Sequence, residues 1–162
     1  MASNQNASFA LAVLLALASI APLAHAKSAT CKIVIEGGSL SQPLEITDPQ
    51  ILNLSNVWMG TFFDVSHDPV PEAPRGIGPY QISFYVKWGG EVQRKYVVYY
   101  HPRLSDPGYI YLPGSGDTWQ FLNWGTVVRR GEDGKWHYAL TEWEKLVKPL
   151  IAHADSLAKY WR

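Results

Sequence analysis

Hydrophobic and polar positions alternate most clearly between residues 80 and 88. The apolar positions are Tyr80, Ile82, Phe84, Val86 and Trp88, and the positions between them are Gln81, Ser83, Tyr85 and Lys87. A period of two residues is typical of a half-buried strand. A second β-rich run, Val92–His101, follows Gly89-Gly90. The two runs therefore predict a hairpin that turns at these glycines.

Shorter runs predict further strands on both sides of this hairpin. The alternation from Cys31 to Glu36 predicts a strand that ends at Gly37-Gly38, with Cys31 as a small apolar core residue. The remaining strand-like runs are Leu44–Ile46, Tyr109–Leu112, Thr118–Leu122, Trp124–Arg130 and Lys135–Ala139. In the last run, His137 follows Trp136 and is expected to point outward. Turn residues separate the later runs at fairly regular intervals, which is typical of an antiparallel meander.

Two segments have helical patterns. Asp48 and Pro49 predict the N-cap and first residue of a brief helix, Pro49–Leu54. Near the C-terminus, Thr141 and Glu144 have the spacing of a capping box. Apolar residues then recur at intervals of three and four, namely Trp143, Leu146, Val147, Leu150, Ile151, Ala154, Leu157, Ala158 and Trp161.

Pro149 lies inside this C-terminal pattern, so we expect a kink there or a break at which the helix restarts. The apolar stripe predicts that the helix covers one face of the sheet. The fold class expected is α+β: an antiparallel meander of about six strands packed by a C-terminal amphipathic helix.

Residues 1–26 predict a secretory signal peptide. They contain no Asp, Glu, Lys or Arg, and residues 9–23 are almost wholly apolar. Ala24-His25-Ala26 supplies the small residues that signal peptidase requires, so we expect cleavage after Ala26. An uncleaved membrane anchor is one alternative, although the apolar run is shorter than the ~20 residues of a spanning helix. A lipoprotein attached through Cys31 is another, but this cysteine lies well beyond the apolar run.

Cleavage would leave residues 27–162 as a single exported domain, periplasmic or extracellular. All the charged residues lie in this part, 14 basic and 14 acidic. Such a balance gives no electrostatic footprint for nucleic acid. A single cysteine allows no internal disulfide, which fits a bacterial exported protein better than a small disulfide-stapled scaffold. No later run is apolar enough for stable membrane insertion after cleavage.

The stretch Gly114-Ser115-Gly116-Asp117 could be a phosphate-binding loop or only a turn. A phosphate loop requires a lysine after its second glycine and a helix that begins there. Thr118 follows Asp117 instead, in a strand-like run. The stretch therefore predicts the loop of a hairpin, in which Asp117 bonds the backbone. Because binding residues often lie at exposed loop tips, Asp117 also remains a candidate binding residue.

The densest group of polar residues that could support catalysis is Asp64, Ser66, His67 and Asp68. It lies in a long Gly- and Pro-rich loop, Asn56–Pro79, which we expect Val57-Trp58-Met59 and Phe62-Phe63 to hold against the core. The group could form a metal site or a nucleophile–base pair, but triad members usually come from separate elements. A solvated loop is the alternative. Because no two histidines have metal-ligand spacing, we predict no metal site and no cofactor.

Aromatic residues make up 13% of the chain, and all seven Trp and nine Tyr lie after residue 26. Exposed Trp and Tyr provide flat amphipathic surfaces for sugars or peptides. The candidate binding residues are Tyr85, Trp119, Trp124 and Trp136, with Asp117 in the loop. Trp119, Trp124 and Trp136 fall in strands predicted to be adjacent, where they could cluster. Cross-strand packing in a disulfide-free β-domain is the alternative role for these rings.

Several segments resemble those of small exported bacterial proteins that have no assigned activity. They are Ile35–Leu40 (IEGGSL), Pro43–Asp48 (PLEITD), Val57-Trp58, Phe84-Tyr85-Val86 and Tyr111-Leu112-Pro113-Gly114. The similarity extends over most of the chain after residue 26, but its motifs are structural. It implies export and a bacterial source, and it implies no chemistry.

Three functions fit the sequence. The first is a non-enzymatic binding or interaction module whose aromatic surface contacts carbohydrate, peptide or an envelope protein. The second is a hydrolase that uses His67 and His101 with the acids Asp64 and Asp68. The third is a structural protein of the envelope. Replacement of His67 by alanine would separate the first two, since it should abolish turnover by an enzyme and leave a binding module largely unaffected.

Overall fold

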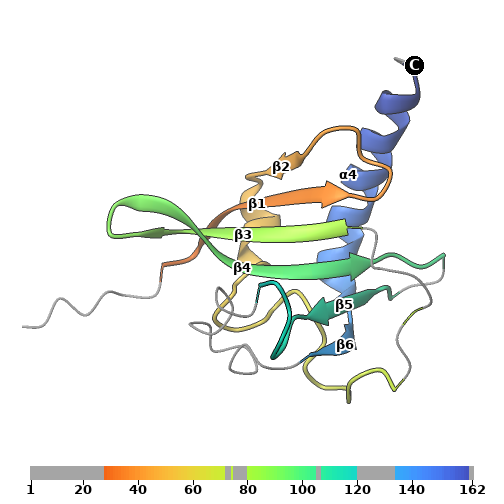
Figure 1. Ribbon diagram of the computed structural model, residues 1–162. Helices are drawn as coiled ribbons and strands as arrows, with labels where there is room; N and C mark the ends of the chain where they lie inside the picture. Colours follow the sequence, from red (N-terminus) through yellow and green to blue (C-terminus); the bar gives the residue numbers. More distant parts are fainter. Residues whose placement is uncertain (1–27, 72–73, 75–79, 105–106, 120–133, 161–162) are drawn as a thin grey trace, which may run out of the picture.

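A six-stranded antiparallel sheet forms the centre of the fold, and two helices lie behind it in the view of Figure 1. The computed structural model describes residues 28–71, 74, 80–104, 107–119 and 134–160, so the predicted signal peptide lies outside the described residues. In order, the elements are β1 (Thr30–Gly37), β2 (Leu44–Ile46), α2 (Pro49–Asn53), β3 (Tyr80–Trp88), β4 (Glu91–His101), β5 (Tyr109–Leu112), β6 (Lys135–Tyr138) and α4 (Thr141–Tyr160). The predicted α+β class is confirmed.

The strands lie in the order β2-β1-β3-β4-β5-β6. From β3 to β6 the chain runs as a meander, and the predicted Gly89-Gly90 hairpin joins β3 to β4. The first strands differ from this pattern, because β1 pairs with β2 on one side and with β3 on the other. The connection through α2 therefore brings the chain back across β1. As predicted, Asp48 caps α2, and its carboxylate accepts the N–H groups of Gln50 and Ile51 at 2.9 and 3.1 Å.

The main core lies between the sheet and α4, which crosses the strands (Figure 1). The fully buried sheet residues on this face include Ile33, Ile35, Ile82, Phe84, Val98, Tyr100, Ile110 and Leu112. From α4, Trp143, Val147 and Ile151 pack against them. The Trp143 ring meets Tyr100 edge-on at 5.6 Å, and its indole N–H donates to Ser55 Oγ at 3.1 Å. This part of the predicted apolar stripe thus faces the sheet, whereas Leu150 is 37% exposed and the side chains beyond residue 156 lie outside the described residues. The helix α4 continues through Pro149 without restarting.

The start of α4 differs from the predicted capping box. The Glu144 side chain is 2% exposed and reaches toward β4 and β5 rather than back to Thr141. It accepts the Tyr100 hydroxyl at 2.5 Å and the backbone N–H of Gly108 at 2.9 and 3.1 Å. The capping-box prediction is wrong because the Glu144 carboxylate instead accepts hydrogen bonds from two buried donors, which would otherwise lack acceptors.

Part of the predicted long loop covers the free edge of β6. Phe63 forms a bridge with Ala139, the Asp64 N–H donates to the Tyr138 carbonyl, and the Val70 N–H donates to the Trp136 carbonyl, both at 2.8 Å. Val57, Phe62 and Phe63 are buried as expected, whereas Met59 is 70% exposed and does not anchor the loop. The segment from Phe62 to Val70 therefore completes the sheet and covers an edge strand that could otherwise pair with other chains.

Three expectations about local strand structure are wrong. Thr118 and Trp119 lie in a turn, so the hairpin partner of β5 is β6, while the predicted strand Trp124–Arg130 lies outside the described residues. His137, expected on the outer face, is fully buried against Phe63, with ring centroids 5.0 Å apart. A register shift between Thr30 and Lys32 buries Thr30 and leaves Cys31 only half-buried.

Candidate functional site

The face of the sheet opposite α4 carries the candidate site. Tyr99 of β4 lies directly opposite Tyr111 of β5, which lies opposite Trp136 of β6. One pair of positions along, His101, Tyr109 and Tyr138 are partners in the same way. Because alternate residues of a strand point to one side, all six side chains share this face. All six are half-buried, and we call them the aromatic surface.

The rings of the aromatic surface form two adjoining rows. In the first row, the centroids of Tyr99 and Tyr111 are 6.3 Å apart and those of Tyr111 and Trp136 are 5.1 Å apart. In the second row, Tyr109 and Tyr138 are 5.5 Å apart. His101 meets Trp136 edge-on at 6.5 Å and joins the rows. Contacts at these distances hold aromatic side chains in place, so a ligand would meet ordered rings.

Several polar atoms of the aromatic surface are available to a ligand. Within the residues that the structure describes, no hydrogen-bond partner is found for the hydroxyls of Tyr99, Tyr109 and Tyr138 or for the indole N–H of Trp136. The Tyr111 hydroxyl, in contrast, donates to Asp117 Oδ2 at 2.8 Å. The surface therefore offers three hydroxyls that can donate or accept and one N–H donor, and the Tyr111 hydroxyl at its edge is bonded to the adjacent turn.

That turn is Gly114-Ser115-Gly116-Asp117; as predicted, Asp117 bonds its backbone, but the turn does not lead directly into the second strand of a hairpin, because β5 pairs with β6. Asp117 Oδ2 also accepts the Gly114 N–H at 2.7 Å, and the Asp117 N–H donates to the Gly114 carbonyl at 3.1 Å. Gly116 has φ of 91°, a conformation that glycine adopts readily. The carboxylate thus closes the turn and fixes the Tyr111 hydroxyl, so Asp117 borders the aromatic surface as a positioning residue.

The other predicted binding residues do not cluster as expected. Only Trp136 belongs to the aromatic surface. Trp119 lies over β3 and β4, where its indole N–H donates to Gln81 Oε1 at 3.1 Å and the Arg94 guanidinium stacks at 4.3 Å. The Tyr85 ring lies beneath the Lys32 ammonium at 4.9 Å, on the β1 side of the sheet. Trp124 lies outside the described residues.

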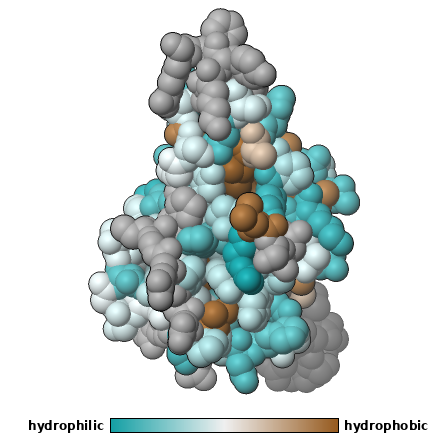
Figure 2. Space-filling model, turned by 90° about the vertical axis from the view of Figure 1, so that its right-hand side faces the viewer, coloured by the Kyte–Doolittle hydropathy of each residue, from teal (hydrophilic) through white to brown (hydrophobic). Residues whose placement is uncertain are grey.

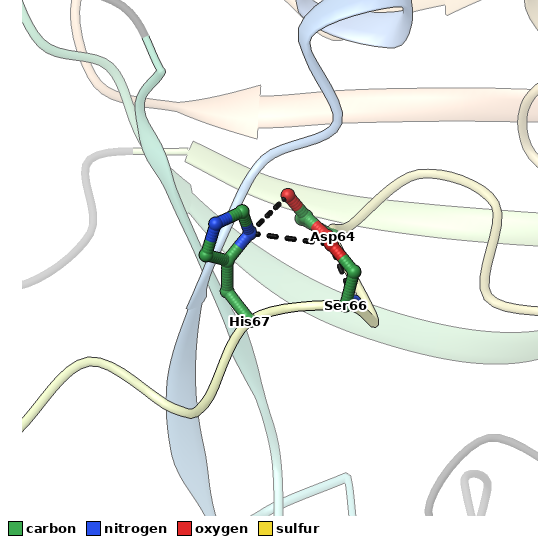
Figure 3. Close-up of polar contacts among 3 residues, drawn as sticks. All are labelled: Asp64, Ser66 and His67. Atoms are coloured by element: carbon green, nitrogen blue, oxygen red, sulfur yellow. Dashed lines mark hydrogen bonds and ion pairs between the residues drawn. The ribbon is translucent and has the colours of Figure 1, made fainter.

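The loop with the predicted catalytic residues forms a tight local cluster (Figure 3). Asp64 Oδ1 accepts the Ser66 hydroxyl at 2.6 Å and the Ser66 N–H at 2.8 Å, and Asp64 Oδ2 meets His67 Nδ1 at 2.7 Å. In a catalytic triad the histidine lies between the acid and the nucleophile and uses both ring nitrogens. Here Ser66 Oγ lies 3.3 Å from His67 Nδ1, but that same nitrogen also faces the Asp64 carboxylate, and the far nitrogen of His67 points away (Figure 3). The geometry is that of a closed turn.

The electrostatics of this loop follow from the same contacts. The Ser66 hydroxyl and backbone N–H, followed by His67, lower the pKa of Asp64 from 3.8 to about 2. His67 is well exposed and meets the Tyr138 ring edge-on at 6.1 Å. The loop therefore holds a firmly ionised carboxylate beside the end of the second aromatic row.

The remaining candidates for hydrolysis stay apart. His101 Nδ1 contacts the Pro102 carbonyl at 3.1 Å and its ring contacts Trp136, while Asp68 is exposed. His101 thus joins the aromatic surface rather than the loop of Asp64 and His67. In the described part of the chain, no group of three or more His, Cys, Asp or Glu side chains is placed to hold a metal ion.

Sequence reasoning missed most of the aromatic surface, although the signal was present. Tyr109 and Tyr111 are two residues apart, as are Tyr99 and His101, and Trp136 and Tyr138. That spacing places each pair on one face of its strand. What the spacing alone could not show was that the three pairs face the same side in register.

The rest of the described surface offers smaller apolar features. The large exposed hydrophobic side chains are Met59, Val65, Val92, Leu104 and Leu150. On the side of the molecule shown in Figure 2, hydrophobic residues occur as small separate patches among hydrophilic ones. No helix in the described part of the chain combines the length and hydrophobicity that crossing a bilayer requires.

Comparisons with known proteins add no assignment. No family model matches the chain, and no match is found among curated proteins or solved structures. The resemblance to small exported bacterial proteins therefore stays a prediction, and the residues of the candidate site are the basis for the function proposed below.

Proposed function

We propose that the protein is an exported, non-enzymatic binding module that contacts its ligand through the aromatic surface. The observation that carries this proposal is the continuity of six half-buried rings across three neighbouring strands. Rings in such positions have apolar faces to bury and polar atoms to pair, and Tyr and Trp are enriched at interfaces for this reason.

The contacts of the polar residues support binding over catalysis. The Asp64 carboxylate is committed to Ser66 and His67, and the Asp117 carboxylate to Tyr111 and Gly114. General acid–base catalysis requires groups poised to exchange protons with a substrate. The low pKa of Asp64 makes this carboxylate a weak base. A hydrolase that uses His67, His101 and the loop acids is the alternative that the experiment below excludes or supports.

The place of action proposed is the periplasm or the outside of a bacterial cell. The support is the apolar, uncharged segment 1–26 with its Ala24-His25-Ala26 end, together with a single cysteine. An envelope protein without a small ligand is the third candidate. It would use the same surface for a protein partner.

The test is ligand binding by protein purified from expression of the full-length chain. Thermal unfolding is measured against neutral oligosaccharides, short peptides and divalent cations, because a ligand that binds only the folded state raises the midpoint. We expect a shift that Trp136→Ala removes and that Trp88→Ala, a change at the opposite end of the sheet, leaves intact. His67→Ala should also leave binding intact.

Two outcomes would contradict this proposal. A shift that survives Trp136→Ala would place binding elsewhere. Hydrolysis of a bound ligand that His67→Ala abolishes would establish the enzyme instead.

A further inference from the structure

A second group of aromatic and apolar side chains lies at the end of the sheet where β3 turns into β4. The ring centroids of Trp58 and Trp88, both half-buried, are 6.3 Å apart, and the Lys95 ammonium lies over the Trp88 ring at 4.8 Å. Met59, next to Trp58, is 70% exposed. Val92, across the hairpin from the residue before Trp88, is 52% exposed. We call these five residues the tip.

The N-terminal end of the described chain is attached to the tip. The Trp58 indole N–H donates to the Ser28 carbonyl at 2.9 Å, and the Thr30 hydroxyl donates to the Ser55 carbonyl at 2.5 Å. In Figure 1 the described chain begins on the side of the molecule where the turn between β3 and β4 extends beyond the rest of the sheet. Leu23, the last residue of the N-terminal apolar run, precedes Ser28 by five residues. A chain of that length spans at most about 18 Å.

We propose that the tip contacts the surface of a lipid bilayer, an inference that rests on the proposed export and is independent of the aromatic surface. An apolar N-terminal segment inserted in a membrane would hold the tip within about 18 Å of that membrane. Trp side chains prefer the boundary between headgroups and hydrocarbon, where exposed apolar side chains such as Met59 and Val92 are also removed from water. The contact proposed is peripheral, and it would retain the processed protein at the membrane surface.

The charges around the tip favour anionic lipid. Lys87 is exposed at the end of β3, and Lys95 covers the last ring of that strand. Lys27 comes just before the described chain. The exposed acid Glu91, in the hairpin turn, offsets one of these cations. Lysine side chains attract anionic headgroups, and their stems can lie along apolar surface while the ammonium reaches the headgroup. The partner inferred is therefore a bilayer that contains an anionic lipid.

The test is sedimentation with lipid vesicles, using protein purified from expression of the full-length chain. We expect tighter binding to vesicles that contain phosphatidylglycerol than to vesicles of phosphatidylcholine alone. Met59→Ser and Lys95→Gln should each weaken binding about 3- to 10-fold. The controls are Leu104→Ser, at a fully exposed side chain beyond the far end of β4, and Lys135→Gln on β6, and neither should change binding. All variants keep the same N-terminus, so differences between them report on the tip.

A second measurement locates the contact on the molecule. Phosphatidylglycerol with brominated acyl chains quenches the fluorescence of tryptophans that lie close to the hydrocarbon. We expect Trp88→Phe to reduce the fraction of the emission that is quenched. Trp136→Phe, on the aromatic surface, should leave that fraction unchanged.

Three outcomes would overturn this inference. They are no binding to phosphatidylglycerol vesicles, losses with Leu104→Ser and Lys135→Gln equal to those of the tip variants, and a fall in quenching with Trp136→Phe in place of Trp88→Phe. Equal binding to phosphatidylcholine vesicles would overturn the preference for anionic lipid. The proposed function depends on the soluble ligand panel with Trp136→Ala, so the two proposals can fail separately.

Discussion

Glu144 shows how one residue can join three elements. The carboxylate comes from the first turn of α4 and accepts donors from Tyr100 of β4 and from Gly108, just before β5. Gly108 has no room for a larger residue, because a Cβ there would lie 2.6 Å from Glu144 Oε1 and 2.8 Å from the His101 carbonyl. Burying a carboxylate costs free energy unless its oxygens accept hydrogen bonds, and here both Glu144 oxygens accept them from the two donors.

We expect Glu144→Gln to destabilise the protein by about 1–3 kcal/mol. The reason is that an amide NH₂ group, which cannot accept, would replace one carboxylate oxygen that now accepts a hydrogen bond from a buried donor. Chemical denaturation measures the loss of unfolding free energy. Glu142→Gln, an exposed acid of the same helical turn, is the control and should change stability by less than about 0.5 kcal/mol. Equal effects of the two substitutions would show that burial at Glu144 has no special weight.

The Asp64 loop gives a pH-dependent prediction at the same scale. The pKa of Asp64 is lowered to about 2 from 3.8. Its ionised form therefore stabilises the folded state above pH 3.8, and this contribution is lost as the pH falls toward 2. Ser66→Ala should raise this pKa toward 3.8 more than His67→Ala does, because the Ser66 hydroxyl is the largest cause of the low pKa and the backbone N–H at position 66 remains in the variant. Carboxyl NMR titration would measure both, and the reverse order would contradict the assignment of causes.

At the level of elements, the segment from Phe62 to Val70 completes the sheet. It occupies the outer edge of β6 with backbone contacts from Phe63, Asp64 and Val70. Phe62 and Phe63 bury their rings on the core side of that segment, against Phe84 at 4.6 Å and His137 at 5.0 Å. The aromatic surface begins on β6, so this edge segment also supports the functional face.

Replacement of Phe63 by alanine should cost about 3–5 kcal/mol of unfolding free energy, because it leaves a cavity beside His137. Val65→Ala, in the same segment at a side chain 61% exposed, is the control and should change stability by under about 0.5 kcal/mol. Thermal and chemical unfolding measure both. A small effect of Phe63→Ala would mean that the edge segment is dispensable to the sheet.

At the scale of the whole molecule, the two faces of the sheet have different tasks. One face packs against α4 and provides the main core. The other face is also covered in part, since Ser83 and Val97 are fully buried there and Trp119 packs alongside. The half-buried rings lie toward β5 and β6. Stability and the proposed binding thus use separate regions of one sheet.

The proposed export gives a prediction for the whole chain. When the full-length chain is expressed in a bacterium, the exported product should begin at Lys27, as N-terminal sequencing would show. Ala26→Arg should block this processing, because signal peptidase requires a small residue there. A product that still begins at Met1 would indicate an anchor. A lipid that Cys31→Ala removes would indicate a lipoprotein.

Much of the fold was predictable because local periodicity is strong. Strict alternation from Tyr80 to Trp88 placed β3, and Gly89-Gly90 placed its turn. The strand predicted at Thr118–Leu122 was wrong over Thr118 and Trp119, where the contacts of Asp117 with Gly114 and of Trp119 with Gln81 favour a turn. Propensity of a short aromatic run is a weak guide when tertiary contacts compete with it.

The sequence by itself determined which residues share a face within each strand and helix, because a period of two or of three to four is a local property of the chain. It thereby determined the α+β class, the α2 cap and the stripe of α4 that meets the sheet. Only the tertiary structure decided that β1 lies between β2 and β3, that Glu144 accepts the Gly108 N–H, and that three separate pairs of rings form one surface. These depend on pairing and register between segments far apart in the chain, which local patterns do not specify.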